Sequence, residues 1–222
     1  MNTPFTRVCL AAVVLAAMVA GLGGCYTKEK QSFFLAVHGG NISEVENMLG
    51  RHDDWVDTVN DEGAQPIHVA AMEGKTKVAV MLLERGADIE AKHKNSWRPL
   101  CWACERGHAP TAEMLLDRGA EIDARDRWGR TPLYWAATHG HKPVVELLIA
   151  RKADVNAADE NGSTPLHEAV RFGEEACVAM LIRAGADVNA MDKAKQRPLG
   201  LATHLKRHEK IRKMLLAAGA TQ

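Results

Sequence analysis

The chain has 222 residues, of which 25% are charged, and its 28 basic residues equal its 28 acidic ones, so the formal net charge is zero. This balance gives no overall electrostatic reason to expect nucleic acid or an anionic membrane surface as the partner. Hydrophobic residues make up 46% of the chain but aromatic residues only 5%, a composition typical of a globular protein with an aliphatic core.

The first 24 residues differ in composition from the rest of the chain. Arg7 precedes an uninterrupted apolar run over residues 8–22, which is shorter than the roughly 18–20 residues that a helix needs to span a bilayer. These features predict a secretory signal peptide over residues 1–24. The run ends in Leu22-Gly23-Gly24-Cys25, which resembles the lipobox of bacterial lipoproteins. The resemblance implies cleavage before Cys25 and lipid attachment to its sulfur.

The lipobox resemblance also implies a location. Residues 25–30 become a lipidated cysteine and a short linker, and the protein is anchored in the cell envelope by its lipid. Tyr26 follows the cysteine where the family's inner-membrane retention signal usually has Asp, so the outer membrane, facing the periplasm, is favoured in a cell with two membranes. The alternatives are an ordinary secretory signal or an uncleaved anchor, with Cys25 incidental.

Internal repeats follow the leader. Five prolines are spaced by 33 residues, each is followed by Ile or Leu, and an alanine stands three residues after that. A fixed period of this length indicates stacked structural repeats, each too small to bury its own apolar face alone. The five prolines are Pro66, Pro99, Pro132, Pro165 and Pro198.

Each repeat predicts two helices and a loop. Thr131 and Pro132 open the first helix, since threonine suits the N-cap and proline the first turn. Leu133 and the alanines after it fall on one face at helical spacing, and Gly140 ends the helix where a left-handed residue is favoured. After a second helix, residues 153–162 predict an extended finger with a tight turn.

The segment Gly162-Ser163-Thr164-Pro165-Leu166-His167-Glu168-Ala169 carries the signature of the ankyrin repeat, which the repeats resemble over residues 31–222. The resemblance implies an all-α repeat solenoid of helix-turn-helix units with β-hairpin fingers. Residues 31–62 are expected to be a degenerate opening repeat. The closing repeat has Gly200 at the position of the motif histidine and one extra residue before His208, so the turn between its helices is expected to depart from that of the other repeats. The full repeats span 63–95, 96–128, 129–161 and 162–194, and the closing repeat spans 195–222.

Cys101 and Cys104 form a CxxC pair, which invites a redox or zinc interpretation. Both fall on repeat positions within the first helix, whereas redox CxxC motifs normally start a helix that follows a strand. A zinc site would need two further ligands at suitable spacing. We therefore expect packing thiols, with a redox protein using these two residues as the less favoured alternative.

The histidines also predict structure rather than catalysis. His68 and His167 occupy the position of the family's histidine that hydrogen-bonds near the helix cap, and His141 matches its common Gly-His at the start of the second helix. His204 and His208 are spaced for one helix face but lack the glutamate of a metalloprotease motif. No catalytic residue, metal or cofactor is predicted, and we expect no enzyme activity and no small-molecule substrate.

The ankyrin resemblance implies a protein-interaction module that binds a protein partner on the concave face, made by the first helices and the fingers. A structural envelope protein that associates with itself is the alternative. Four of the five tryptophans fall in two adjacent repeats, and Trp and Arg are enriched at binding hot spots. The partner-binding residues predicted from position within the repeat are Lys94, Trp97, Arg106, Arg127, Trp128, Arg130, Trp135, His139 and Phe172.

Two expectations concern the tryptophans of this surface. Trp97 and Trp128 are placed at finger tips, where folding gains nothing from tryptophan, so we expect both to be exposed for binding. Trp102 and Trp135 occupy equivalent sites one repeat apart and are expected to stack side by side, or else to fill space between the first helices. Arginine forks match carboxylates, so the partner surface is expected to be acidic.

Overall fold

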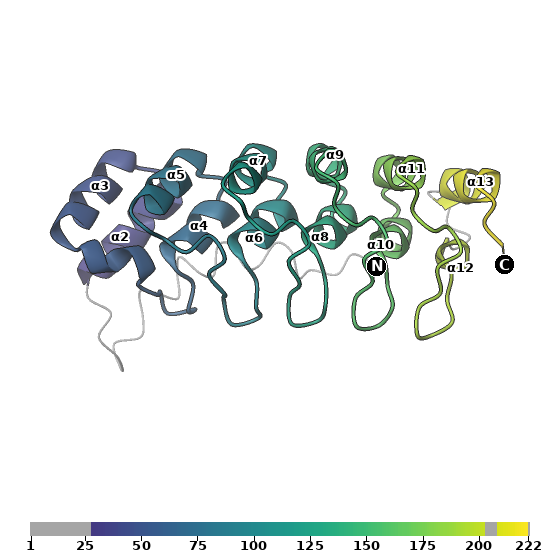
Figure 1. Ribbon diagram of the computed structural model, residues 1–222, viewed down its shortest axis with the longest axis horizontal. Coiled ribbons are helices and arrows are strands. Elements are labelled where there is room, and N and C mark those ends of the chain that lie inside the picture. The colour runs from purple at the N-terminus through teal and green to yellow at the C-terminus, as the bar shows by residue number, and fades with distance from the viewer. Residues whose placement is uncertain (1–27, 203–207, 222) are drawn as a thin grey trace.

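The computed structural model describes residues 28–202 and 208–221, and its helices form a two-layered stack (Figure 1). The second helices of the repeats form the upper layer and the first helices the lower layer, from which the fingers extend. In chain order the helices are α2 (Lys28–Gly39), α3 (Ile42–Arg51), the short 3-10 helix Asp53–Asp57, α4 (Pro66–Met72), α5 (Thr76–Glu84), α6 (Pro99–Glu105), α7 (Ala109–Asp117), α8 (Pro132–Thr138), α9 (Lys142–Ala150), α10 (Pro165–Phe172), α11 (Glu175–Arg183), α12 (Pro198–Leu201) and α13 (Glu209–Ala217).

The ends of the helices confirm the predicted signals. The Thr131 hydroxyl accepts a hydrogen bond from the backbone N–H of Tyr134 at 3.3 Å and so caps α8. Gly140 follows α8 with φ +69°, a left-handed conformation that residues with a Cβ rarely adopt. At Gly107, an added Cβ would lie 2.6 Å from His141 Nδ1, so the close packing of neighbouring repeats also requires glycine there.

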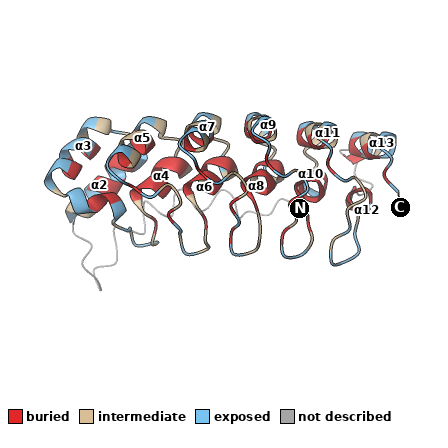
Figure 2. Ribbon diagram, viewed as in Figure 1, coloured by how far each residue is buried: buried red, intermediate tan, exposed pale blue. Residues whose placement is uncertain are grey.

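The core lies between the two helix layers, and the buried residues run along the whole stack (Figure 2). Equivalent leucines of successive first helices, such as Leu100, Leu133 and Leu166, are fully buried, as are the alanines three positions later. Small side chains at those positions let adjacent first helices pack closely. Each repeat is therefore stabilised mainly by its neighbours, as in other solenoids.

The fingers are tight turns and not the β-hairpins implied by the family resemblance. Within the described ranges, no segment forms a strand. Two backbone bonds close each finger, as from Asp126 N to the Arg130 carbonyl and from Gly129 N to the Asp126 carbonyl, both at 3.0 Å. A single backbone bond also links the third finger (residues 126–130) to the fourth (residues 159–163), from Glu160 N to the Trp128 carbonyl at 2.9 Å. With so few bonds per finger, side-chain contacts contribute strongly to its shape.

The two ends of the stack depart from the internal repeats. Helix α2 already includes Lys28–Lys30, which the sequence assigned to the linker, and α12 has only four residues. None of the helices in the described ranges is long and apolar enough to cross a membrane. The predicted signal peptide, Cys25, Tyr26 and His204 lie outside the described residues.

Candidate protein-binding surface

We call the side of the stack formed by the first helices and the fingers the finger face. Its most distinctive feature is a continuous row of aromatic rings in the second and third full repeats. The Trp97 ring lies 4.5 Å from the Trp102 ring and 4.7 Å from the Trp135 ring, measured between centroids. Trp135 in turn lies 6.0 Å from His139 in a stacked arrangement. The three predicted residues Trp97, Trp135 and His139 therefore form one connected row of rings together with Trp102.

Two arginines extend this row toward the finger tip. The Arg130 guanidinium lies 4.9 Å from the Trp128 ring centroid, 5.0 Å from that of Trp135 and 5.5 Å from that of Tyr134. Arg127 lies 4.7 Å from the Trp128 ring and is exposed. Cation–π contacts of this kind contribute about 0.5–1 kcal/mol when exposed and more when desolvated. They fix Trp128 as a partly exposed platform with positive charge beside it.

The structure corrects two expectations about the tryptophans. Trp97 is only 8% exposed, because its ring packs against the rings of Trp102 in α6 and Trp135 in α8 instead of extending from the finger tip. Trp102 and Trp135 each contact Trp97, so the equivalent tryptophans are joined through that ring rather than by the predicted direct stack. Trp128 is half-buried rather than fully exposed.

The other predicted residues are distributed around this row. Lys94 and Arg106 are exposed. Glu105 joins two predicted positions, since its carboxylate lies 2.7 Å from Arg106 Nε and 3.9 Å from His139 Nε2. Phe172 is 50% exposed at the end of α10, in the repeat that follows. Lys94, Arg106 and Phe172, which lie around the aromatic row, therefore all present their side chains to solvent.

Sequence reasoning missed His93, which occupies a special position in its finger. The equivalent residues elsewhere are Asn60, Asp126, Asp159 and Asp192, and their side chains hold the finger turns. Comparing the fingers position by position would have revealed the exception.

Asp126 shows what this position normally does. One oxygen of its buried carboxylate accepts from the backbone N–H groups of Trp128 at 2.8 Å and Arg130 at 3.0 Å. The other oxygen accepts from Trp135 Nε1 at 3.2 Å. The His93 ring instead directs Nε2 to the Glu62 carbonyl oxygen at 3.1 Å. The Trp102 indole, equivalent to that of Trp135, is left without an acceptor.

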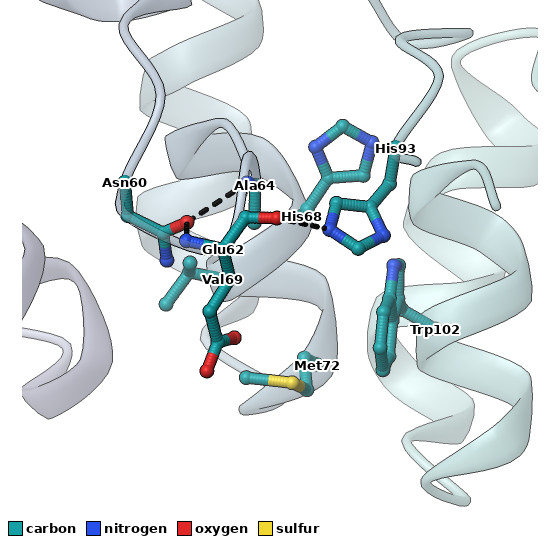
Figure 3. Close-up of a pocket in the computed structure, with 8 residues that line it drawn as sticks. All are labelled: Asn60, Glu62, Ala64, His68, Val69, Met72, His93 and Trp102. Atoms are coloured by element: carbon teal, nitrogen blue, oxygen red, sulfur yellow. Dashed lines mark hydrogen bonds between the residues drawn. The ribbon is translucent and has the colours of Figure 1, made fainter. Parts of the chain in front are cut away.

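A small pocket opens beside His93, between the fingers at residues 60–64 and 93–97 (Figure 3). Its volume is about 30 Å³. His93 Nδ1 and Trp102 Nε1 both lie buried at this site without a hydrogen-bond partner. Figure 3 shows the Trp102 nitrogen on the side of the indole that faces His93. The lining residues are Asn60, Glu62, Ala64, His68, Val69, Met72, His93 and Trp102.

His68 also lines this pocket and supports the second finger (residues 93–97). Its Nε2 is 2.8 Å from the Ala91 carbonyl oxygen, and its Nδ1 accepts from Gln65 N at 3.1 Å. This confirms the predicted structural role. Burial lowers the pKa of His68 to about 4, opposed in part by the bond to Ala91 and reinforced by the nearby His93. Since Nδ1 accepts, the neutral ring donates through Nε2.

The cysteines are arranged for packing rather than reactivity. Cys101 and Cys104 are fully buried and unpaired. Burial raises the pKa of Cys101 to about 12 and that of Cys104 well above its usual value. A thiol acts as nucleophile or metal ligand only as thiolate, so this environment disfavours both roles. In the part of the chain that the structure describes, no group of three or more His, Cys, Asp or Glu residues is placed to hold a metal ion.

Comparisons with known proteins agree with this architecture. The family profile described as "Ankyrin repeats (3 copies)" matches residues 33–126, 119–192 and 158–222. Because these matches extend over most of the chain, the protein belongs to the ankyrin-repeat family. A crystal structure of an ankyrin repeat domain from Acinetobacter baumannii AYE is similar with a TM-score of 0.75 and 31% sequence identity, over 86% of this chain and 100% of that one.

Two curated proteins share shorter segments. Ankyrin repeat domain-containing protein 35 of Homo sapiens is 33% identical over 70 residues, which is 32% of this chain and 7% of that protein. Protein phosphatase 1 regulatory subunit 27 of Mus musculus is 28% identical over 68 residues, or 31% of this chain and 44% of that protein. The chain therefore spans less than half the length of either relative. Ankyrin repeats are a generic protein-protein interaction module, and in general a non-enzymatic one.

Proposed function

We propose that this protein is a lipid-anchored interaction module of the cell envelope, tethered through Cys25, that binds a protein partner on its finger face. The partner-binding residues are the exposed or half-buried members of the predicted set, centred on Arg127 and Trp128. The proposal includes an outer-membrane location facing the periplasm, as implied by Tyr26. Its support comes from the lipobox-like sequence and from the finger face.

The observation that carries the binding proposal is the Trp128 platform. A tryptophan held half-exposed between Arg127 and Arg130 combines the two residue types most enriched at binding hot spots. Lys94, on the preceding finger, adds positive charge and is exposed, so its side chain is not needed in the core. This chemistry suits a partner with an acidic surface and an apolar side chain that packs on the indole. The mouse relative is named as a regulatory subunit, which supports binding rather than catalysis.

Capture from detergent-solubilised membranes tests the partner-binding proposal. The full chain serves as bait, beside the Arg127→Ala and Trp128→Ala variants. Each should weaken capture of the partner by about 2 kcal/mol, as for a hot spot, without lowering the melting temperature by more than a few degrees. Arg118→Ala is the matched control, since Arg118 is exposed on the outer helix layer. Equal capture by all four proteins would place the interface elsewhere.

Membrane fractionation tests the tether separately. Cys25→Ala should remove the acceptor for the lipid, so that the chain either leaves the membrane fraction or stays as the uncleaved precursor. The Cys177→Ala variant is the control for loss of a thiol. A Cys25→Ala protein that is processed and fractionates like the wild type would contradict lipid anchoring, while leaving the binding proposal intact.

A further inference from the structure

The pocket between the fingers at residues 60–64 and 93–97 has a defined hydrogen-bonding pattern. His93 Nε2 lies 3.1 Å from the Glu62 carbonyl oxygen, and a carbonyl oxygen only accepts. Nε2 therefore carries the proton, and in the neutral ring Nδ1 presents a lone pair. Trp102 Nε1–H is a donor and never an acceptor. One unmet acceptor and one unmet donor therefore lie buried in the wall of the pocket.

A buried polar atom without a partner is unfavourable, and here two such atoms belong to residues that line one pocket. The ring centroids of His93 and Trp102 are 5.9 Å apart. The next repeat avoids this cost, because Asp126 accepts from the equivalent tryptophan. A ligand that removes both costs must offer an acceptor to Trp102 and a donor to His93.

We propose that this pocket binds a primary carboxamide, the side chain of an Asn or Gln on the protein partner. Its oxygen accepts from Trp102 Nε1–H, and its NH₂ group donates to His93 Nδ1. A carboxylate offers no donor and an ammonium no acceptor. The inference rests on the proposed protein-binding function, since the pocket supplies one specific contact at the edge of that interface.

The size and walls of the pocket fit the tip of one side chain. Roughly 10–15 Å³ holds one water, so a volume of about 30 Å³ admits two or three heavy atoms, and a carboxamide has three. Val69 and Met72 form an apolar wall, against which the methylene groups of the same side chain pack.

Small-molecule titrations followed by NMR test this pocket without knowledge of the partner. The probes are propionamide, propionate, propylammonium and propanol, added to the full ¹⁵N-labelled chain, in which each tryptophan indole N–H gives its own signal. Propionamide should shift the Trp102 signal saturably and leave that of Trp55 in place. Propanol, which also donates and accepts, should bind more weakly, and the two ions should have no saturable effect.

The His93→Asp variant is the matched test of mechanism. It gives the second finger the residue of the third, so that a carboxylate of the chain itself can accept from Trp102. Propionamide affinity should fall about tenfold or more, as expected for the loss of two hydrogen bonds. This variant should be folded, since the same residue serves that position in the three fingers that follow.

Three results would overturn the carboxamide proposal. No saturable shift with any probe would mean that the two groups pair with each other or with water. Stronger binding of propanol or propionate than of propionamide would assign a different ligand. An unchanged affinity in His93→Asp would place the amide elsewhere. None of these outcomes affects the capture experiment with Arg127→Ala and Trp128→Ala, so the two proposals fail independently.

Discussion

The fingers at residues 93–97 and 126–130 occupy equivalent places in adjacent repeats but are built differently. In the third finger, Asp126 accepts three hydrogen bonds. In the second finger, His93 stands at that position, so Trp102 Nε1 lacks an acceptor. The fold thus tolerates a less satisfied turn beside its most aromatic surface.

The turn residue differs as well. Gly129 adopts φ +77° in the third finger, whereas Ser96 adopts φ +58° at the equivalent position of the second. A left-handed conformation is unfavourable for residues with a Cβ. Lys195 adopts φ +59° at the same position of the fifth finger, so the fold tolerates a residue with a Cβ there, and of the two departures in the second finger only His93 lines the pocket. The second finger therefore forms the proposed pocket, whereas Asp126 holds the third finger in the shape that presents the Trp128 platform.

Making the third finger resemble the second should have the largest effect. Asp126→His removes an acceptor from two backbone N–H groups and one indole, and should lower the free energy of unfolding by about 3 kcal/mol. Urea unfolding followed by circular dichroism measures it. The control, Asp61→His at an exposed position of the first finger, should change stability by less than about 0.5 kcal/mol. Equal stability of the two variants would remove the basis of the comparison.

Acid should also separate the two fingers, because different residues support them. Before the second finger, His68 Nε2 donates to the Ala91 carbonyl, and before the third, the Cys101 thiol lies 4.0 Å from the Ala124 carbonyl. Burial lowers the folded-state pKa of His68 to about 4 and raises that of Cys101 to about 12. As the pH falls from 6.5 to 4, the unfolded chain takes up a proton at His68 while the folded chain does not. The free energy of unfolding should therefore be intact above pH 6.5 and decrease by up to about 3 kcal/mol at pH 4.

Urea unfolding at several pH values checks this dependence. The His68→Asn variant should be less stable at pH 7 but should lose less stability on acidification, since it has no ring to protonate. His167, whose pKa is also lowered by burial, contributes in the same direction and remains in both proteins. An identical pH dependence of the two proteins would show that His68 does not titrate in this way.

Giving the second finger the aspartate should have a smaller and opposite effect. His93→Asp supplies an acceptor for the Trp102 indole and for the finger backbone, and should raise the free energy of unfolding by about 1 kcal/mol. Thermal and urea unfolding measure the gain. A loss of stability would indicate that the His93 bond to the Glu62 carbonyl contributes more than the aspartate would.

The smallest expected effect concerns the turn glycine. Ser96→Gly relieves the left-handed conformation but increases the freedom of the unfolded chain, and should stabilise by about 0.5 kcal/mol. The reverse change, Gly129→Ser, should destabilise, since a Cβ there would lie 3.1 Å from Glu160 N. If both substitutions changed the melting temperature in the same direction, backbone strain at Ser96 would not be the cause.

Much of the fold could be predicted from the sequence. The 33-residue spacing of prolines located the first helices α4, α6, α8, α10 and α12, and the structure confirmed the Thr131 cap and the Gly140 turn. Periodicity works here because each repeat contacts mainly its neighbours. The fingers were predicted less well, because the family resemblance implied hairpins where two backbone bonds close each turn without forming a strand.

The site was harder to predict, since its properties depend on contacts between repeats. Position within the repeat identified Trp97 but not its burial, which follows from two rings of other elements. His93 carried a signal in the sequence, as the one histidine at a position otherwise held by Asn or Asp. Its unmet nitrogen depends on the direction of the ring, which no sequence pattern specifies.

Site-specific photo-crosslinking in intact cells tests the central claim, that a protein partner binds the finger face. A photoreactive residue replaces Lys94 in one protein and Glu146, exposed on the outer layer, in another. We expect a covalent adduct of defined mass at position 94 and none at position 146. The yield of the adduct at position 94 should fall when His93→Asp is added. An adduct at position 146 alone, or equal adducts at both positions, would contradict the claim.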